Sequence, residues 1–401
     1  MKRRVKKTAF FVLALTGALS MCQPTLGKSF SLKKDETAQV EEIVEETDPS
    51  APPEREIDGD VYYELDSAED LFWFAEKVNS GETEINAVLT DNITINSEAY
   101  DGTNGESLTE WIPIERYKGS FDGQNHIISG LYVNTSDSYG GLFGTVFEGG
   151  IIKNLGITDS YIRAGYLVGA VCGQMSKGTM SGCYNTGIVE GGTHCGAVCG
   201  QVEDGTISGC YNTGIVKNGS FGTGGICGAS QGGTITNCYN TGDVSAHDYA
   251  AGICGSNEHG GTISYCYNTG EITTNRYYGY YTGGICANNI AFWGDTLISH
   301  CYNTGTLNGW TGSVAGICAR NSEPQGAYGR YYNLNYENCY YLDTTAKTGT
   351  LGIELEGVES KTAEEFENGV VAGLLNDGSD ECSFVQNTET DSSPVLAVFN
   401  Q

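Results

Sequence analysis

Apolar and polar residues alternate over short runs along most of this chain, and glycine or asparagine separates the runs. Residues 233–244 read Gly-Thr-Ile-Thr-Asn-Cys-Tyr-Asn-Thr-Gly-Asp-Val. This pattern predicts a short strand, a turn and a second short strand. Asn and Gly tolerate the left-handed backbone that a tight corner needs. Such a unit leaves an apolar face exposed, so it must bury that face against copies of itself.

Two repeated strings supply the copies. Cys-Tyr-Asn-Thr-Gly occurs at 183–187, 210–214, 238–242, 266–270 and 301–305. The second string, which is Gly-x-x-Cys or, at 251–254 and 315–318, Ala-Gly-Ile-Cys, has cysteines spaced by 27, 28, 27, 32 and 32 residues: Cys172, Cys199, Cys227, Cys254, Cys286 and Cys318. A nearly constant period indicates one structural unit stacked on itself. We therefore predict an all-β fold, a parallel β-solenoid of about nine coils, with a right-handed β-helix as the expected hand.

In such a stack, equivalent residues of neighbouring coils lie about 4.8 Å apart. The Asn of each Cys-Tyr-Asn-Thr-Gly string should therefore form a ladder of side-chain amides. The Tyr of the same string should form a regular, structural ladder of rings.

The two ends of the chain predict capping helices. In residues 66–79, Ser67 pairs with Asp70 as an approximate capping box, and one face carries Leu71, Phe74, Ala75 and Val78. Thr362 and Glu365 begin a second predicted helix with an apolar face of Phe366, Val370, Val371, Leu374 and Leu375. It should stop at residues 376–378, Asn-Asp-Gly, and a last strand is expected at 395–399. Helices at these places would cover the open core at each end of a solenoid.

The resulting domain organisation has five segments. Residues 1–22 have a cationic start and a short apolar stretch, as in a secretory signal peptide. Cys22 ends a string that resembles a lipoprotein box, which makes it a candidate lipidation site. Residues 23–57 are predicted to be a disordered acidic linker, residues 58–96 an N-terminal cap with the first coil, residues 97–343 the solenoid repeats, and residues 344–401 a C-terminal cap. No stretch is long enough to cross a membrane.

Most of the fifteen cysteines fall in two columns of the repeat. The unit just before the first cysteines fills those columns with Phe143 and Leu155, which indicates core positions, and a free cysteine packs as a small apolar residue. Disulfides between adjacent coils stay open as an alternative, because the coil spacing suits them. The spacing does not favour a metal site, and no cofactor is expected.

The net charge is −29, and it becomes −34 once the five cations of residues 1–22 are removed. This charge argues against nucleic acid or an anionic membrane as a partner. It favours a soluble, self-repelling chain, which we expect to be a monomer.

Several of these segments together resemble the bacterial GLUG-motif proteins, which are named for strings such as Gly-Leu-Phe-Gly at 141–144. The resemblance covers roughly residues 62–400 and includes Trp-Ile-Pro-Ile at 111–114, Phe-Asp-Gly at 121–123 and the Asn-Cys-Tyr-Asn-Thr-Gly coils. It implies a secreted or surface-attached protein of the kind usually regarded as an adhesin. Some relatives carry a zinc peptidase domain that needs His-Glu-x-x-His. That string is absent here, so no catalytic residue is carried over.

Aromatic residues crowd the lengthened later coils and are the candidate ligand-binding residues, because Tyr and Trp offer large contact areas on loops. They are Tyr277, Tyr278, Tyr280, Tyr281, Trp293, Trp310, Tyr328, Tyr331 and Tyr332. The expected ligand is a glycan or a surface protein of a host or neighbouring cell, with no enzymatic activity. A passive surface spacer is the main alternative. A polysaccharide lyase or hydrolase is less favoured. Such an enzyme needs a cluster of Asp, Lys and Arg that departs from the repeat pattern, and no coil has one.

Overall fold

The computed structural model describes residues 48, 50–136, 138–275, 280–322, 332–351, 355–377 and 383–399, with only the backbone at Asn218. The chain divides into Met1–Thr47 and Asp48–Gln401, and all of the described residues belong to the second unit. The predicted signal peptide, Cys22 and most of the predicted linker therefore lie outside the described residues.

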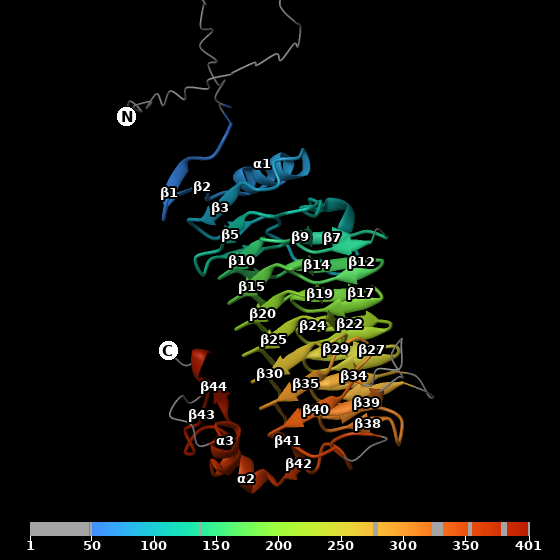
Figure 1. Cartoon of the computed structure of the whole chain (residues 1–401). Coiled ribbons are helices and arrows are strands. Elements are labelled where there is room, and N and C mark those ends of the chain that lie inside the picture. Colours follow the sequence, from blue (N-terminus) through green and yellow to red (C-terminus); the bar gives the residue numbers. More distant parts are fainter. Residues whose placement is uncertain are drawn as a thin grey trace, which may run out of the picture. The chain divides into compact units, whose positions relative to one another are not determined.

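The second unit is a parallel β-solenoid of about nine coils, as predicted (Figure 1). A full coil passes through five short strands, which we number as sheets 1 to 5 in chain order. One coil consists of β15 (Thr179–Ser181), β16 (Tyr184–Asn185), β17 (Ile188–Gly191), β18 (His194–Gly196) and β19 (Cys199–Glu203). The next strand, β20 (Thr206–Ser208), pairs in parallel with β15 and opens the following coil.

Sheets 1 and 2 are the longest. Besides β15 and β20, sheet 1 contains β1 (Glu54–Ile57), β2 (Asp60–Leu65), β3 (Asn86–Leu89), β5 (Ser120–Asp122), β10 (Ile151–Lys153), β25 (Thr234–Thr236), β30 (Thr262–Ser264), β35 (Thr296–Ser299) and β40 (Leu334–Glu337). Besides β16, sheet 2 contains β4 (Ile93–Thr94), β6 (Ile127–Ser129), β11 (Gly156–Thr158), β21 (Tyr211–Asn212), β26 (Tyr239–Asn240), β31 (Tyr267–Asn268), β36 (Tyr302–Asn303), β41 (Cys339–Leu342) and β42 (Val358–Lys361).

Sheets 3, 4 and 5 have seven strands each. Sheet 3 adds to β17 the strands β7 (Tyr132–Asn134), β12 (Tyr161–Ala164), β22 (Ile215–Gly219), β27 (Val244–Ala246), β32 (Ile272–Thr274) and β37 (Leu307–Asn308). Sheet 4 adds to β18 the strands β8 (Tyr139–Gly140), β13 (Leu167–Val168), β23 (Gly222–Gly224), β28 (Tyr249–Ala251), β33 (Tyr281–Gly283) and β38 (Val314–Ala315). Sheet 5 adds to β19 the strands β9 (Phe143–Val146), β14 (Cys172–Ser176), β24 (Cys227–Gln231), β29 (Cys254–Glu258), β34 (Cys286–Ile290) and β39 (Cys318–Ser322).

The cysteine columns are core columns. Every described cysteine is a free, buried thiol, so the structure realises the first of the two alternatives. Cys172 pairs in register with Phe143, as the repeat alignment predicts. The thiols are hydrogen-bonded locally: Cys238 Sγ donates to the carbonyl oxygen of Thr236 at 3.1 Å. Cys195, which stands outside both columns, is also buried, and burial raises the pKa of its thiol.

The predicted amide ladder is confirmed. Five fully buried Asn side chains run down the interior of sheet 2: Asn185, Asn212, Asn240, Asn268 and Asn303. Each of the first four donates from Nδ2 to Oδ1 of the next at 2.8–2.9 Å. Each Nδ2 also donates to the carbonyl oxygen of the glycine two residues ahead. The ladder therefore satisfies its buried polar groups while tying each corner to the next coil.

The N-terminal cap agrees with the sequence in its helix and differs in its start. Helix α1 (Ala68–Asn79) has Ser67 as its N-cap and buries the four predicted apolar residues. The predicted linker, residues 23–57, extends too far, because its last four residues form β1, which pairs antiparallel with β2. Asp58 and Gly59 make the two-residue turn with positive φ, the turn that a tight hairpin favours.

The C-terminal cap corrects a second prediction. Two short helices replace the single predicted one: α2 (Ala363–Glu367), which has the predicted Thr362–Glu365 capping box, and α3 (Val370–Leu375). Gly369 between them has φ of 83°, which ends the first helix and turns the chain. As a result Val370 and Leu374 are exposed. The last strand is also shorter than predicted, since β44 (Val395–Leu396) pairs with β43 (Phe384–Val385) and is followed by a 3-10 turn at Ala397–Phe399.

The ring ladder on the outer face of sheet 2 explains where this cap packs. Consecutive rings are nearly parallel, with centroids 4.7–5.0 Å apart, at Tyr184, Tyr211, Tyr239, Tyr267 and Tyr302. Phe366 and Phe384 pack on Tyr302, and Phe399 packs edge-on against Tyr239 at 4.8 Å. The C-terminal segment thus runs back beside the stack (Figure 1). The Tyr column is structural, as predicted.

Burial of this ladder predicts a delayed alkaline titration. Burial raises the pKa of Tyr239 to about 12, whereas an unfolded tyrosine titrates at about 10. The stability contributed by the protonated ring is therefore fully present below about pH 10 and is lost as the pH rises to about 12. We expect tyrosinate absorbance to rise in two steps, the later one coinciding with loss of β-structure in circular dichroism. A Tyr239→Phe variant should shrink the later step, and a single step near pH 10 would contradict the prediction.

Candidate binding surface

The structure separates the predicted aromatic residues into two places. Tyr277, Tyr278, Tyr328 and Tyr331 lie outside the described residues. Tyr280, Tyr281 and Trp310 lie where sheet 3 turns into sheet 4. Trp293 and Tyr332 lie at a different corner, between sheets 5 and 1, where Tyr332 is half-buried against the core. The described candidates therefore do not form one patch.

The first of these corners continues beyond the predicted residues. Seven successive coils each place at least one aromatic ring or imidazole at the start of sheet 4 or just before it. We call this set the aromatic stripe: Tyr139, Tyr166, His194, Phe221, Tyr249, Tyr281 with its neighbour Tyr280, and Trp310. Its most exposed members are Phe221 (60%), Tyr166 (46%) and Trp310 (42%). Exposed large aromatic side chains that gather at one corner are typical of an interaction surface.

Backbone hydrogen bonds fix the register of the stripe. Thr193 N–H donates to the carbonyl oxygen of Tyr166 at 2.6 Å, and Phe221 N–H donates to that of Thr193 at 2.9 Å. Two coils further, Tyr281 N–H donates to the carbonyl oxygen of Asp248 at 3.0 Å. The corner residues of successive coils are thus stacked one strand spacing apart on a continuous parallel sheet.

Ring contacts hold parts of the stripe in place. Tyr249 and Tyr281 are stacked with centroids 5.7 Å apart and planes 2° apart. Tyr166 meets His194 edge-on at 6.4 Å. Gly222 makes room for that imidazole, because a Cβ at this position would lie 2.9 Å from His194 Nδ1. Burial lowers the pKa of His194, so its ring is neutral at pH 7.

Charges of both signs flank the stripe on sheet 3. Arg163, Glu190 and Lys217 are in register on neighbouring strands. Lys217 Nζ lies 3.1 Å from Glu190 Oε2, and Tyr161 donates its hydroxyl to the same oxygen at 3.0 Å. The acidic and basic groups thus offset one another beside the stripe, and the surface next to the rings has no single sign.

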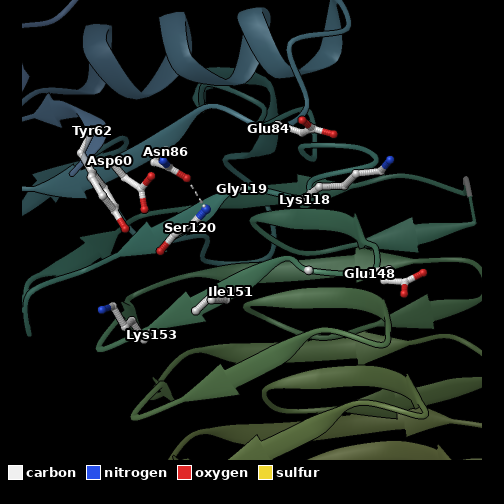
Figure 2. Close-up of a pocket in the computed structure, with 11 residues that line it drawn as sticks. Asp60, Tyr62, Glu84, Asn86, Lys118, Gly119, Ser120, Glu148, Ile151 and Lys153 are labelled. Atoms are coloured by element: carbon white, nitrogen blue, oxygen red, sulfur yellow. Dashed lines mark hydrogen bonds between the residues drawn. The ribbon is translucent and has the colours of Figure 1, made fainter. Parts of the chain in front are cut away.

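Apart from the stripe, a hollow of about 590 Å³ lies on sheet 1 near its first strands. Figure 2 shows Asp60, Tyr62 and Asn86 at one end and Glu84, Lys118 and Glu148 at the other. Asn86 accepts a hydrogen bond from the backbone N–H of Ser120 at 2.8 Å, and Lys153 pairs with Asp122 at 3.2 Å. Its lining is mixed in charge and has one aromatic ring. No group of three or more His, Cys, Asp or Glu in the described part of the chain is placed to hold a metal ion.

Sequence reasoning missed five members of the stripe: Tyr139, Tyr166, His194, Phe221 and Tyr249. A signal was present, because each of these residues stands a few positions before a Gly-x-x-Cys string or its Gly-x-x-Phe equivalent at 140–143. The residue type and the offset both vary from coil to coil. Only the strand positions show that the side chains share one corner, where they occupy two adjacent register columns.

Comparisons with known proteins agree with the repeat architecture. The family model described as "The GLUG motif" matches residues 219–245, a segment that begins just before Phe221. The chain contains a GLUG motif. This match covers one coil of the stack, and the related strings in the other coils repeat the same pattern of strands.

Two curated relatives match short parts of the chain. Halomucin of Haloquadratum walsbyi is 31% identical over 133 residues, which is 32% of this chain and 1% of halomucin. A "Putative Gly-rich membrane protein" of Evansella cellulosilytica is 39% identical over 71 residues, which is 16% of this chain and 8% of that protein. The chain therefore spans less than a tenth of the length of either relative.

A solved structure is also similar. It is titled as a putative immunoglobulin A1 protease from Bacteroides ovatus, with 20% identity, a TM-score of 0.48, and coverage of 84% of this chain and 92% of that one. Separately, within the described residues of this chain no helix has the length and apolarity needed to span a bilayer.

Proposed function

We propose that this chain is a non-enzymatic surface or extracellular binding protein, and that the aromatic stripe is its ligand site. The observation that carries the proposal is the set of rings at one corner on seven successive coils, of which Phe221, Tyr166 and Trp310 are exposed and the others half-buried. A parallel stack fixes the rings at regular intervals, so little conformational entropy is lost when a ligand binds.

The surroundings of the stripe support binding over a structural role. The ring ladder of sheet 2 is Tyr in every one of its five coils, and the C-terminal segment packs against it. This packing explains why the same residue recurs there. The stripe instead varies between Tyr, His, Phe and Trp and presents several of its rings to solvent. Aromatic residues of this kind dominate the binding energy of many interfaces.

The names of the two relatives fit an extracellular or surface setting, as does the predicted signal peptide at residues 1–22. Lipidation at Cys22 would attach the protein to a membrane surface. Both features belong to the proposal. A mass measurement of the mature N-terminus checks them: cleavage before residue 23 without lipid would remove the anchor and leave a secreted form.

A binding array tests the central claim. The purified chain is applied to glycans and extracellular-matrix proteins beside a stripe variant carrying Tyr166→Ser, Phe221→Ser and Trp310→Ser. We expect the native chain to bind and the variant to bind at least tenfold more weakly. Trp293→Ser is the matched control, since Trp293 is 52% exposed but lies at the other corner. Equal binding by the stripe variant would mean that the ligand binds elsewhere and would overturn the stripe as its site. No binding by the native chain would favour the passive spacer. Circular dichroism verifies that the variants are folded.

A further inference from the structure

We infer that the aromatic stripe takes one extended chain of a neutral β-1,4-linked glycan, lying along the axis of the stack. This inference rests on the proposed function and names the chemical class of its ligand. It follows from the alternation of side chains along the corner and from the local charge.

The corner residues alternate between ring and polar side chain. In one column that follows the backbone register, successive coils carry Tyr166, Thr193, Phe221, Asp248 and Tyr280. Aromatic rings therefore recur every second coil, about 9.6 Å apart at the usual strand spacing. The intervening coils carry Thr193 and Asp248, which are both half-buried, and Asp248 Oδ1 is itself a buried atom.

An extended β-1,4-linked glycan has a repeat of nearly this length. Each sugar in such a chain is turned over relative to the last, so every second sugar presents the same face to one side. A ring at every second coil can stack on those faces, because the C–H groups of a pyranose pack against aromatic rings. Thr193 and Asp248 lie level with the sugars between, whose hydroxyls can donate to the Thr193 hydroxyl and to Asp248 Oδ2, since Asp248 Oδ1 is buried.

The geometry of the stack restricts the linkage. The strands of sheet 4 are parallel and in register from β13 to β33, so the column continues from coil to coil without a shift. A β-1,4-linked chain is extended and can follow such a column. Chains with α-1,4 or β-1,3 linkages coil and would leave the column after one or two sugars.

Charge restricts the ligand further. The chain carries a net charge of −29, which repels acidic polysaccharides. Within the column Asp248 is an acidic residue, and Lys217 on the flanking sheet 3 is already paired with Glu190. A neutral glycan avoids this repulsion and can still donate hydrogen bonds to Asp248.

Calorimetric titration with defined oligosaccharides tests the inference. The probes are cellohexaose and the hexamer of β-1,4-linked N-acetylglucosamine, with maltohexaose and laminarihexaose as linkage controls. We expect at least one β-1,4 hexamer to bind tenfold more tightly than either control and tenfold more tightly than its own dimer. Tyr166→Ala and Phe221→Ala should each weaken binding about tenfold, whereas Trp293→Ala should not.

A variant that breaks the alternation sharpens the test. Combining Phe221→Ser with Thr193→Phe keeps the number of rings and moves one by a single coil, so the rings no longer match alternate sugars. Binding restored by this variant would overturn the spacing argument. If neither β-1,4 hexamer binds while the array shows another stripe-dependent ligand, this inference fails and the proposed function stands. If nothing binds through the stripe, both fail.

Discussion

Replacing Asn240 with alanine is expected to lower the free energy of unfolding by about 4 kcal/mol, because it leaves several buried polar groups without partners. Asn240 Nδ2 donates to Asn268 Oδ1 and to the carbonyl oxygen of Gly242, both at 2.8 Å. Asn240 Oδ1 accepts from Asn212 Nδ2 at 2.8 Å. Alanine removes all three hydrogen bonds at a position with no solvent exposure, so water cannot replace them. Urea denaturation followed by circular dichroism measures the loss.

Thr241→Ala is the matched control for this prediction. Thr241 is the next residue at the same corner, and its side chain is exposed. Its backbone N–H, which donates to the carbonyl oxygen of Asn212, is unchanged by the substitution. We expect the control to change stability by about 0.5 kcal/mol or less. A loss of under about 1 kcal/mol in Asn240→Ala would show that the ladder contributes little beyond its packing.

The sequence predicts the repeated part of this fold well because the repeat encodes its own neighbours. Once coils with the same string stack, Cys172 must meet Cys199, and Asn212 must meet Asn240. The core columns, the amide ladder and the ring ladder all follow from the period. Short-range signals also identified α1 and the Thr362–Glu365 cap, because capping depends on residues three apart.

The parts that sequence reasoning missed depend on contacts between segments that do not repeat. The period places Tyr239 on an outer face but does not reveal that Phe399 covers it from the far end of the chain. The Asp58–Gly59 hairpin was overlooked because the acidic composition around it favoured a linker. Gly369 stands within an apolar helical pattern, and its positive φ is seen only in the folded chain.

The candidate site shows the same division. Composition drew attention to the Tyr-rich insertions, and three residues near them, Tyr280, Tyr281 and Trp310, do belong to the stripe. The other members are single residues in otherwise ordinary coils. Their common position depends on strand register, which small offsets before each Gly-x-x-Cys string conceal. Composition therefore found part of the surface and also included Trp293, which lies at another corner.

Gly242→Ala is expected to destabilise the stack by about 3 kcal/mol or more, since the added methyl would overpack a backbone contact that cannot move alone. A Cβ at Gly242 would meet the carbonyl oxygen of Gly214 in the preceding coil and would lie 2.7 Å from Asn212 Nδ2. The same close approach recurs at Gly187, Gly214, Gly270 and Gly305, so it is a property of the corner. Relief of this clash would require neighbouring coils to separate, and that would stretch the amide ladder as well.

Gly373→Ala is the control for this prediction. No heavy atom lies within 4 Å of a Cβ built at Gly373, and alanine favours helix α3, so a gain in stability of up to about 1 kcal/mol is expected. Both are read from urea denaturation. A native midpoint for Gly242→Ala would mean that the coils do not approach each other this closely at the Asn-Thr-Gly corner.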